Sequence, residues 1–236
     1  MVELDQELAA KLALSCNILA HEGHSDITMG HVSVRLLGQQ YIHMKPRGLG
    51  LEEVQAADII VIDLAGKKVA GKHERPSEYP IHTEIYKLRD DVNCVIHTHP
   101  PFATALGAAG GGLHPIGHEG VPFQNLPLFK ETTVLIQTQS QGQAVAKCLG
   151  DARAALLLNH GVVVVGRSIE EATIYGILLE KGAEMEYLAR QFGARVWSSE
   201  EETQLKVEQI YHDKNIRAFW EYYVRRIKRR GINQKY

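Results

Sequence analysis

Two histidines separated by a single residue, His97 and His99, are the first feature of this chain that could do chemistry. They follow the apolar pair Val95-Ile96 and precede Pro100, so the pattern predicts that they end a β-strand. Side chains at positions i and i+2 of a strand point to the same face, and both imidazoles can therefore reach one point. Imidazole nitrogens bind zinc, iron and copper, whereas the simpler interpretation is two polar residues at a strand end.

A third histidine, His160, ends a second apolar run, Leu157-Leu158-Asn159-His160, and Gly161 follows it. A buried imidazole needs a partner, because burying an unpaired polar group costs roughly a few kcal/mol. Either a metal ion or a backbone group could be that partner. Three neutral imidazoles with an open coordination position are typical of a catalytic metal site rather than a structural one.

Glu78 lies where a helix is expected to begin, in the segment Pro76-Ser77-Glu78-Tyr79-Pro80, with Ser77 as the expected N-cap. From there its carboxylate could bind the metal or move a proton beside it. The alternative is a first-turn carboxylate that only complements the helix dipole. The residue types alone leave both interpretations open.

Helices and strands alternate along the chain in the pattern of an α/β protein. Strands are predicted at 31–36, 41–44, 59–64, 92–97, 133–136, 154–159 and 162–165. Helices are predicted at 3–21, 77–89, 143–149, 168–192 and 200–229. Residues 107–127 are rich in Gly and Pro and are predicted to form a long loop, which in a compact domain is usually functional. We expect one layered domain over residues 1–236, with a helical C-terminal tail from about 200 to 236.

The composition narrows the class of protein. The 236 residues carry 26 basic and 28 acidic side chains, a net charge of -2, which gives no general attraction for nucleic acid or a membrane surface. The basic run 222–230 is interpreted as a solvated helix face. Three widely spaced cysteines without a CxxC motif indicate neither a disulfide framework nor a thiolate zinc site. Without a signal-peptide pattern or a long apolar stretch, the sequence predicts a cytoplasmic protein.

In order and spacing, three motifs resemble those of the class II aldolase/adducin family: Pro76-Ser77-Glu78, Val95-Ile96-His97-Thr98-His99 and Leu157-Leu158-Asn159-His160-Gly161. The resemblance covers residues 7 to 210, approximately. It implies a three-layer αβα sandwich with a mixed, largely antiparallel central sheet. It also implies a homotetramer with active sites between subunits. His97, His99 and His160 would bind one divalent metal ion, Zn²⁺ or Mn²⁺, and Glu78 would be the acid/base.

The sequence departs from the sugar-phosphate-binding members of this family where those members bind phosphate. Those members have a Gly-Asn before a Ser, a hydroxyl residue before a Gly, and a Ser-Ser before the catalytic Glu. This chain has His31 with Ser33 at the first of these places, Arg47 with Gly48 at the second, and Ser77 alone at the third. Guanidinium groups pair bidentately with carboxylates. The pattern is therefore similar to that of the metal-dependent decarboxylases of hydroxylated pyridine or benzene dicarboxylates, and these five residues are expected to bind a small anionic substrate. A solvent-facing turn is the other interpretation of Arg47.

The sequence therefore predicts a divalent-metal-dependent decarboxylase of a hydroxylated aromatic or heteroaromatic dicarboxylate. His118 is a candidate partner acid, because related aldolases place a Tyr of the neighbouring subunit near this part of the loop. An ordinary loop histidine is an equally good interpretation, and His114 and Glu119 are weaker candidates. Two other functions remain open: a sugar-phosphate aldolase or epimerase on the same metal, and a scaffold without catalysis.

Overall fold

A mixed β-sheet forms the centre of the computed structural model, which describes residues 5–36, 38–193 and 196–229. Among these residues the strand order is β4-β3-β2-β1-β5-β8-β7-β6. The strands are β1 His31–Arg35, β2 Tyr41–Met44, β3 Ile60–Asp63, β4 Lys68–Ala70, β5 Cys94–Thr98, β6 Leu128–Phe129, β7 Ala154–Leu157 and β8 Gly161–Gly166. Neighbouring strands are antiparallel except β6 and β7, which are parallel. The predicted largely antiparallel sheet is confirmed.

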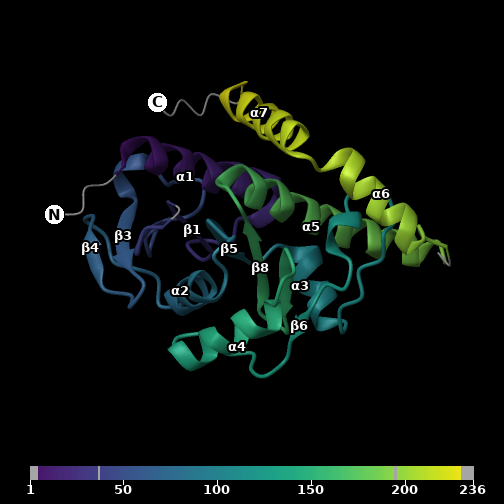
Figure 1. The fold of residues 1–236 in the computed structure, drawn as a ribbon, viewed down its shortest axis with the longest axis horizontal. Coiled ribbons are helices and arrows are strands. Elements are labelled where there is room, and N and C mark those ends of the chain that lie inside the picture. Colours follow the sequence, from purple (N-terminus) through teal and green to yellow (C-terminus); the bar gives the residue numbers. More distant parts are fainter. Residues whose placement is uncertain (1–4, 37, 194–195, 230–236) are drawn as a thin grey trace.

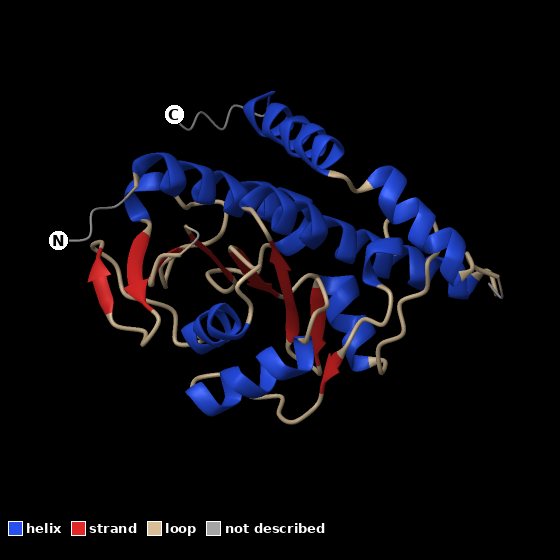
Figure 2. Cartoon of the chain, viewed as in Figure 1, coloured by secondary structure: helices blue, strands red, loops and turns tan. Residues whose placement is uncertain are grey.

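Helices cover both faces of the sheet, and the molecule is a three-layer αβα sandwich (Figures 1 and 2). The helices are α1 Gln6–Leu19, α2 Tyr79–Leu88, α3 Pro101–Ala108, α4 Gln139–Leu149, α5 Ile169–Gln191, α6 Glu200–Ile210 and α7 Asp213–Arg229. One apolar core lies between the sheet and α1, α3 and α5, and the other between the sheet and α2 and α4. Alternation along the strands fills both cores, since Ile96 belongs to the first and Val95 to the second.

The predicted helix over 200–229 is wrong in one respect, because the chain forms two helices with a break at Tyr211 and His212. The Tyr211 ring is only 6% exposed, and its hydroxyl donates to the His118 carbonyl oxygen at 2.7 Å. Burial of this ring against the loop turns the chain between α6 and α7. The expected tail also includes residues 230–236, and the expected first helix includes residues 3 and 4; these lie outside the described residues.

Two further predictions around Glu78 are wrong. Residues 133–136 form no strand; the backbone N–H of Ile136 instead donates to Glu78 Oε1 at 2.8 Å. Glu78 rather than Ser77 occupies the N-cap position of α2, and its side chain caps no backbone group there. The Glu78 carboxylate is therefore free of the helix and is held by a loop that lies far away in the sequence.

Three further elements also differ from expectation. Strand β4 and helix α3 were not predicted, and β7 ends at Leu157 rather than at residue 159. Residues 158–160 form the tight turn between β7 and β8, with Asn159 at a φ of +52°. This turn brings His160 to the same end of the sheet as the end of β5.

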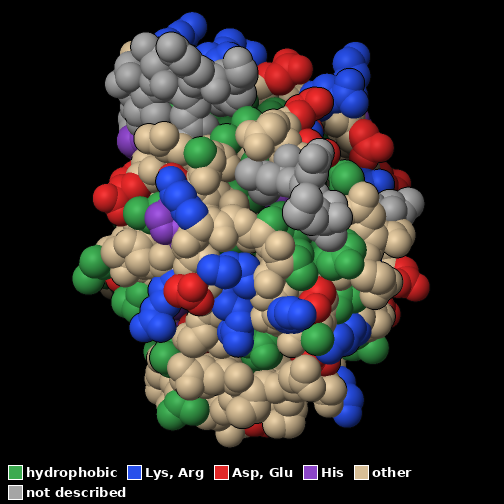
Figure 3. Space-filling model, turned by 90° about the vertical axis from the view of Figure 1, so that its left-hand side faces the viewer, with side chains coloured by type: hydrophobic (Ala, Val, Ile, Leu, Met, Phe, Trp, Pro, Cys, Tyr) green, Lys and Arg blue, Asp and Glu red, His purple; other side chains and the backbone are tan. Residues whose placement is uncertain are grey.

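None of the helices described for this chain is long and apolar enough to cross a membrane. Lys and Arg side chains gather near the middle of the face that lies on the left in Figure 1 (Figure 3). Lys68 and Lys72, from β4 and the turn after it, pair with Glu74 and Asp58, respectively. Each of these two lysines therefore has a carboxylate close to its charge.

Candidate metal centre and active site

The three predicted metal ligands converge at one end of the sheet. His97 lies in β5, His99 directly follows that strand, and His160 ends the turn between β7 and β8. The Nε2 atoms of His97 and His99 are 3.2 Å apart. The ring centroids of His97 and His160 are 4.9 Å apart, and one ligand atom from each histidine lies within 4.8 Å of the others. The spacing expected from the sequence is present in three dimensions.

Backbone and carboxylate groups behind the histidines orient two of the rings. His97 Nδ1 lies 3.0 Å from the Val162 carbonyl oxygen, which can only accept, so Nδ1 carries the proton. His99 Nδ1 lies 2.9 Å from Asp26 Oδ2 in the same way. In neutral rings both Nε2 atoms therefore present lone pairs to each other. Two facing lone pairs at this distance favour a cation between them, and partners of this kind are typical behind metal-bound histidines.

His160 supports the same interpretation. Both of its ring nitrogens are buried and have no hydrogen-bond partner among the described residues. Its Nε2 lies 3.4 Å from Glu78 Oε1, a charge contact without hydrogen-bond geometry. A buried imidazole without a partner is costly in a folded protein. A divalent cation at the three histidines would satisfy one ring nitrogen of His160 and the facing lone pairs of His97 and His99, so the residues fit such an ion.

Glu78 places a negative charge beside this group. Its Oε2 lies 3.7 Å from His97 Nε2, while Oε1 accepts the Ile136 N–H. Burial by itself would raise the pKa of Glu78, but contacts with His160 and His97 hold it well below its usual range. The carboxylate is therefore ionised, and one of its oxygens remains available to a metal ion or to a proton.

A pocket of about 230 Å³ opens beside Glu78. Three of the predicted substrate-binding residues, His31, Arg47 and Ser77, line it. The Arg47 side chain is exposed and has no carboxylate partner within the described part of the chain. A cationic pocket thus lies directly against the carboxylate of the candidate metal centre.

Lys45 is a pocket residue that the sequence analysis missed. It is 1% exposed, and its Nζ donates to the carbonyl oxygens of Thr28 and Pro46 at 3.2 and 3.3 Å. Burial lowers the pKa of Lys45, although nearby acidic groups partly oppose this effect. The sequence analysis assigned Arg47 and Gly48 of the same segment to the substrate but gave Lys45 no role. The position of Lys45 directly after strand β2, at the same end of the sheet as Arg47, was the available signal.

The other three predicted site residues lie elsewhere within this chain. Ser33 is fully buried behind His31, where its hydroxyl contacts His82 and Tyr86. Gly48, at a φ of +88°, shapes the turn after Arg47 without lining the pocket. His118 lines a separate cavity beside α5 and α7. A role for His118 in catalysis therefore requires a second subunit and stays a prediction.

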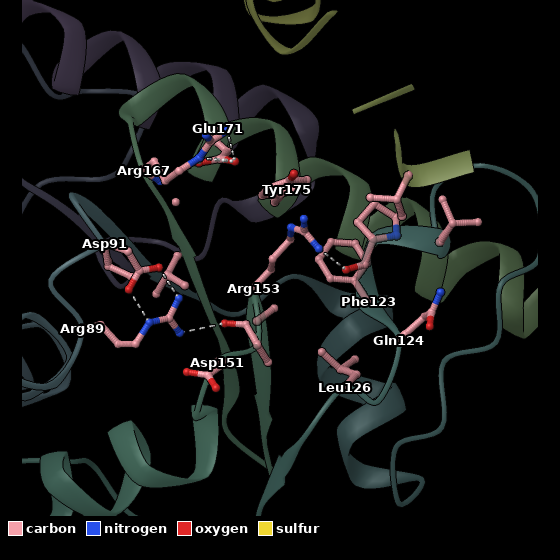
Figure 4. A pocket seen from close by; sticks show the side chains of 18 of the residues that line it. Arg89, Asp91, Phe123, Gln124, Leu126, Asp151, Arg153, Arg167, Glu171 and Tyr175 are labelled. Atoms are coloured by element: carbon pink, nitrogen blue, oxygen red, sulfur yellow. Dashed lines mark hydrogen bonds and ion pairs between the residues drawn. The ribbon is translucent and has the colours of Figure 1, made fainter. Parts of the chain in front are cut away.

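A larger cavity, of about 380 Å³, lies at the opposite end of β5, β7 and β8 (Figure 4). Arg89 is paired there with Asp91 through two contacts of 2.7 Å, and Arg167 is paired with Glu171. Arg153 lies over the Tyr175 ring, 5.2 Å from its centroid. Most of the charge here is neutralised within the cavity wall, and the predicted site residues all lie elsewhere.

The comparisons with known proteins agree with this geometry. The family model for the class II aldolase and adducin N-terminal domain matches residues 10–187. A 3,4-dihydroxyphthalate decarboxylase from Arthrobacter keyseri is 33% identical over 183 residues, which cover 72% of this chain and 73% of that protein.

Solved structures share the fold over nearly the whole length. An aldolase II superfamily protein from Pseudomonas syringae superimposes with a TM-score of 0.87 at 24% identity, covering 99% of this chain and 97% of the other. An L-fuculose 1-phosphate aldolase from Glaciozyma antarctica PI12 gives a TM-score of 0.85 at 22% identity, covering 98% and 92%. Together with the family-model match and the identity to the Arthrobacter keyseri protein, these likenesses show that the chain belongs to the class II aldolase and adducin family.

Proposed function

We propose that this chain is a divalent-metal-dependent decarboxylase of a hydroxylated aromatic or heteroaromatic dicarboxylate. The observation that carries the proposal is the pocket beside Glu78, where Arg47 and Lys45 supply two cations. Arg is suited to bidentate recognition of a planar carboxylate. The identity of 33% to a protein named 3,4-dihydroxyphthalate decarboxylase supports the same substrate class.

His97, His99 and His160 would hold the metal ion, with Glu78 as a possible fourth ligand in the resting site. When bound, Zn²⁺ or Mn²⁺ would supply a Lewis acid for an oxygen next to the carbon–carbon bond that breaks. Arg47 and Lys45 would bind the carboxylate that is retained. Their positive charges would fix the ring so that the carbon that loses carbon dioxide lies beside Glu78.

Glu78 would move the proton that the reaction needs. Its ionised carboxylate first takes the proton of the ring hydroxyl and then delivers it to the ring carbon that loses carbon dioxide. The new carbon–hydrogen bond forms with ring electrons supplied by the deprotonated hydroxyl oxygen, and the electrons of the broken carbon–carbon bond return to the ring and restore its aromaticity as carbon dioxide leaves. Solvent returns a proton to the hydroxyl oxygen when product leaves. The N–H of Ile136 holds one carboxylate oxygen in place throughout.

A complete site would require a neighbouring subunit. We propose a homotetramer in which the loop that contains His118 reaches the adjacent pocket, because within one chain this loop contacts Tyr211 instead. Light scattering should give four chains per particle. In such an assembly, His118→Ala should lower turnover without loss of metal.

The proposal is tested by metal analysis of the purified protein, followed by two assays. We expect one divalent ion per chain, carbon dioxide release from 3,4-dihydroxyphthalate and no cleavage of L-fuculose 1-phosphate. The second substrate is a real alternative, because Arg47 and Lys45 could also pair with a phosphate. Cleavage of the sugar phosphate alone would overturn the decarboxylase in favour of an aldolase. A protein that binds no metal would fit a scaffold.

Glu78→Gln should retain the metal and lose roughly 10²–10⁴-fold in turnover, because the amide cannot accept a proton. Glu74→Gln is the matched control, since the Glu74 side chain is 80% exposed and pairs with Lys68 alone among the residues that the structure describes. An unchanged rate in Glu78→Gln would remove Glu78 from the mechanism.

A further inference from the structure

The pocket beside Glu78 is lined by charged and by apolar side chains. Its cations are Lys45 and Arg47, in the segment that follows β2. Leu135 and Met29 also line it, from two loops far apart in the sequence, and each of these large apolar side chains is 48% exposed. A lining of both kinds suits a ligand that carries negative charge on an apolar body.

Leu135 directly precedes the residue that holds the Glu78 carboxylate. The backbone N–H of Ile136 donates to Glu78 Oε1 at 2.8 Å. The Ile136 side chain is fully buried in the core that the sheet forms with α2 and α4, whereas Leu135 is left outside that core. Because consecutive Cα atoms are only about 3.8 Å apart, a ligand that contacts Leu135 also lies near the Glu78 carboxylate. The proposed mechanism requires the ring carbon that receives the proton to lie there.

Met29 belongs to the turn beside the metal site. Its backbone N–H donates to the Asp26 carbonyl oxygen at 2.8 Å, and the Asp26 side chain contacts His99. The next residue, Gly30, has a φ of +74° and lies so close to Thr98 that an added Cβ would be 3.2 Å from the Thr98 methyl group. This loop is therefore held against the end of β5. The flexible thioether of methionine makes favourable contacts with aromatic rings, so Met29 suits a ring that lies next to the metal site.

We propose that Leu135 and Met29 form an apolar wall that contacts the ring of the substrate and determines specificity for an aromatic dicarboxylate. The inference rests on the proposed function and adds to it the residues that recognise the ring. Lys45 and Arg47 recognise negative charge, which an open-chain dicarboxylate or a sugar phosphate also carries. The apolar wall distinguishes the ring from these ligands, because aromatic surface gains free energy when it leaves water, whereas sugar hydroxyls against the wall would lose hydrogen bonds to water.

The test is calorimetric binding of phthalate and of maleate to the full-length, zinc-loaded protein, at a pH at which both probes are dianions. Both probes carry two carboxylates in cis on neighbouring carbons, and phthalate alone adds the rest of an aromatic ring. Neither probe has the hydroxyl that the proposed reaction needs, so both bind without turnover. We expect the wild-type protein to bind phthalate roughly 10-fold more tightly than maleate, because the ring adds apolar surface that leaves water.

Leu135→Ser and Met29→Ser should each weaken phthalate binding roughly 3- to 10-fold and leave maleate binding unchanged. Both side chains are half-exposed, so their replacement opens no cavity in a core. Val134→Ser and Ile27→Ser are the matched controls. Val134 is the neighbour of Leu135, and Ile27 lies two residues before Met29; they are 61% and 78% exposed, and neither lines the pocket. Both controls should keep the wild-type affinity for each probe.

Equal affinity of the wild-type protein for the two probes, or no binding of phthalate, would overturn the apolar wall. An equal loss of phthalate affinity in Leu135→Ser and Val134→Ser would also overturn it, and an unchanged affinity in Met29→Ser would remove Met29 from it. Carbon dioxide release from 3,4-dihydroxyphthalate, measured on the same wild-type sample, separates the two proposals. A phthalate preference that depends on Leu135, without carbon dioxide release, overturns the proposed decarboxylase alone. Carbon dioxide release without that preference overturns the apolar wall alone.

Discussion

Asn159 has the backbone conformation on which the position of His160 depends. Its φ of +52° lies in the left-handed region, where Asn is tolerated and β-branched residues are strained. Asn159→Val should therefore cost about 1–2 kcal/mol of unfolding free energy and weaken metal binding, whereas Asn159→Gly should retain both. Thermal unfolding and zinc titration measure these effects. Equal zinc affinity in the Val and Gly variants would show that the turn does not position His160.

Asp26 orients His99 through its contact with Nδ1 at 2.9 Å. Carboxylates behind metal-bound histidines typically contribute 10–100-fold to metal affinity, and Asp26→Ala should lose roughly that much. Ser25→Ala is the control, because Ser25 lies in the same segment but bonds to Glu52. Competition with a chelator gives both affinities. A similar loss in the two variants would point to a general disturbance of the segment 25–29.

At the scale of elements, helix α5 binds the glycine-rich loop after α3 through the side chain of Glu186. It accepts from the His114 backbone N–H at 3.0 Å and from Arg190 Nε at 2.7 Å. Burial would raise the pKa of Glu186, but Arg190 and His114 keep it below the usual 4.5. A depressed folded-state pKa gives stability that is present above pH 4.5 and is lost as the pH falls through the folded value.

Glu186→Gln should therefore reduce stability at pH 7 and make the remaining stability less sensitive to pH below about 4.5 than in the wild-type protein. Urea unfolding at pH 7 and pH 4 measures both effects. Glu184→Gln, two residues earlier on an exposed part of the same helix, is the control. If the Gln variant keeps the full pH dependence of the wild-type protein, Glu186 is not the group responsible.

Local patterns predicted the elements whose signals lie within a few residues. Apolar patterning predicted β1, β5, β7 and β8, and the helix predicted from residue 168 begins as α5 at Ile169, where the Ser168 side chain accepts the Glu171 N–H. Errors arose where partners are far apart in sequence. The loop at Ile136 binds Glu78 across 58 residues, and burial of Tyr211 breaks the last helix through a contact across 93 residues. No local pattern carries such information.

The site residues divide in the same way, into those that local patterns predict and those whose positions depend on contacts far apart in the sequence. The metal histidines were visible because two of them are two residues apart and each of the two segments ends an apolar run. The positions of Ser33, His82 and Tyr86 depend on how α2 packs on β1, and the sequence analysis therefore placed Ser33 in the pocket instead of behind it. The basic C-terminal helix was expected to be solvated, yet Arg226 pairs with the nearly buried Glu22 at 2.7 Å.

At the scale of the whole molecule, the metal centre joins the ends of β5 and of the β7–β8 turn, which are separate in sequence but adjacent in the sheet. An ion that binds these converged histidines binds the folded chain in preference to the unfolded one. Stabilisation then grows with free ion concentration, by about 4 kcal/mol when that concentration is 1,000 times the dissociation constant. Removal of the ion with a chelator should lower the Tm, and added Zn²⁺ should restore it.

The dependence on zinc concentration makes this last prediction specific. His160→Asn should abolish the zinc-dependent rise in Tm, because it removes the ligand that comes from the β7–β8 turn. His73→Asn is the control, because His73 pairs with Asp58, which also binds Lys72, and His73 lies outside the two candidate metal groups. A Tm that rises with zinc equally in the wild-type protein and in His160→Asn would place the stabilising ion elsewhere. His160 would then be a buried histidine rather than a metal ligand, and the proposed centre would lose its link between the two strand ends.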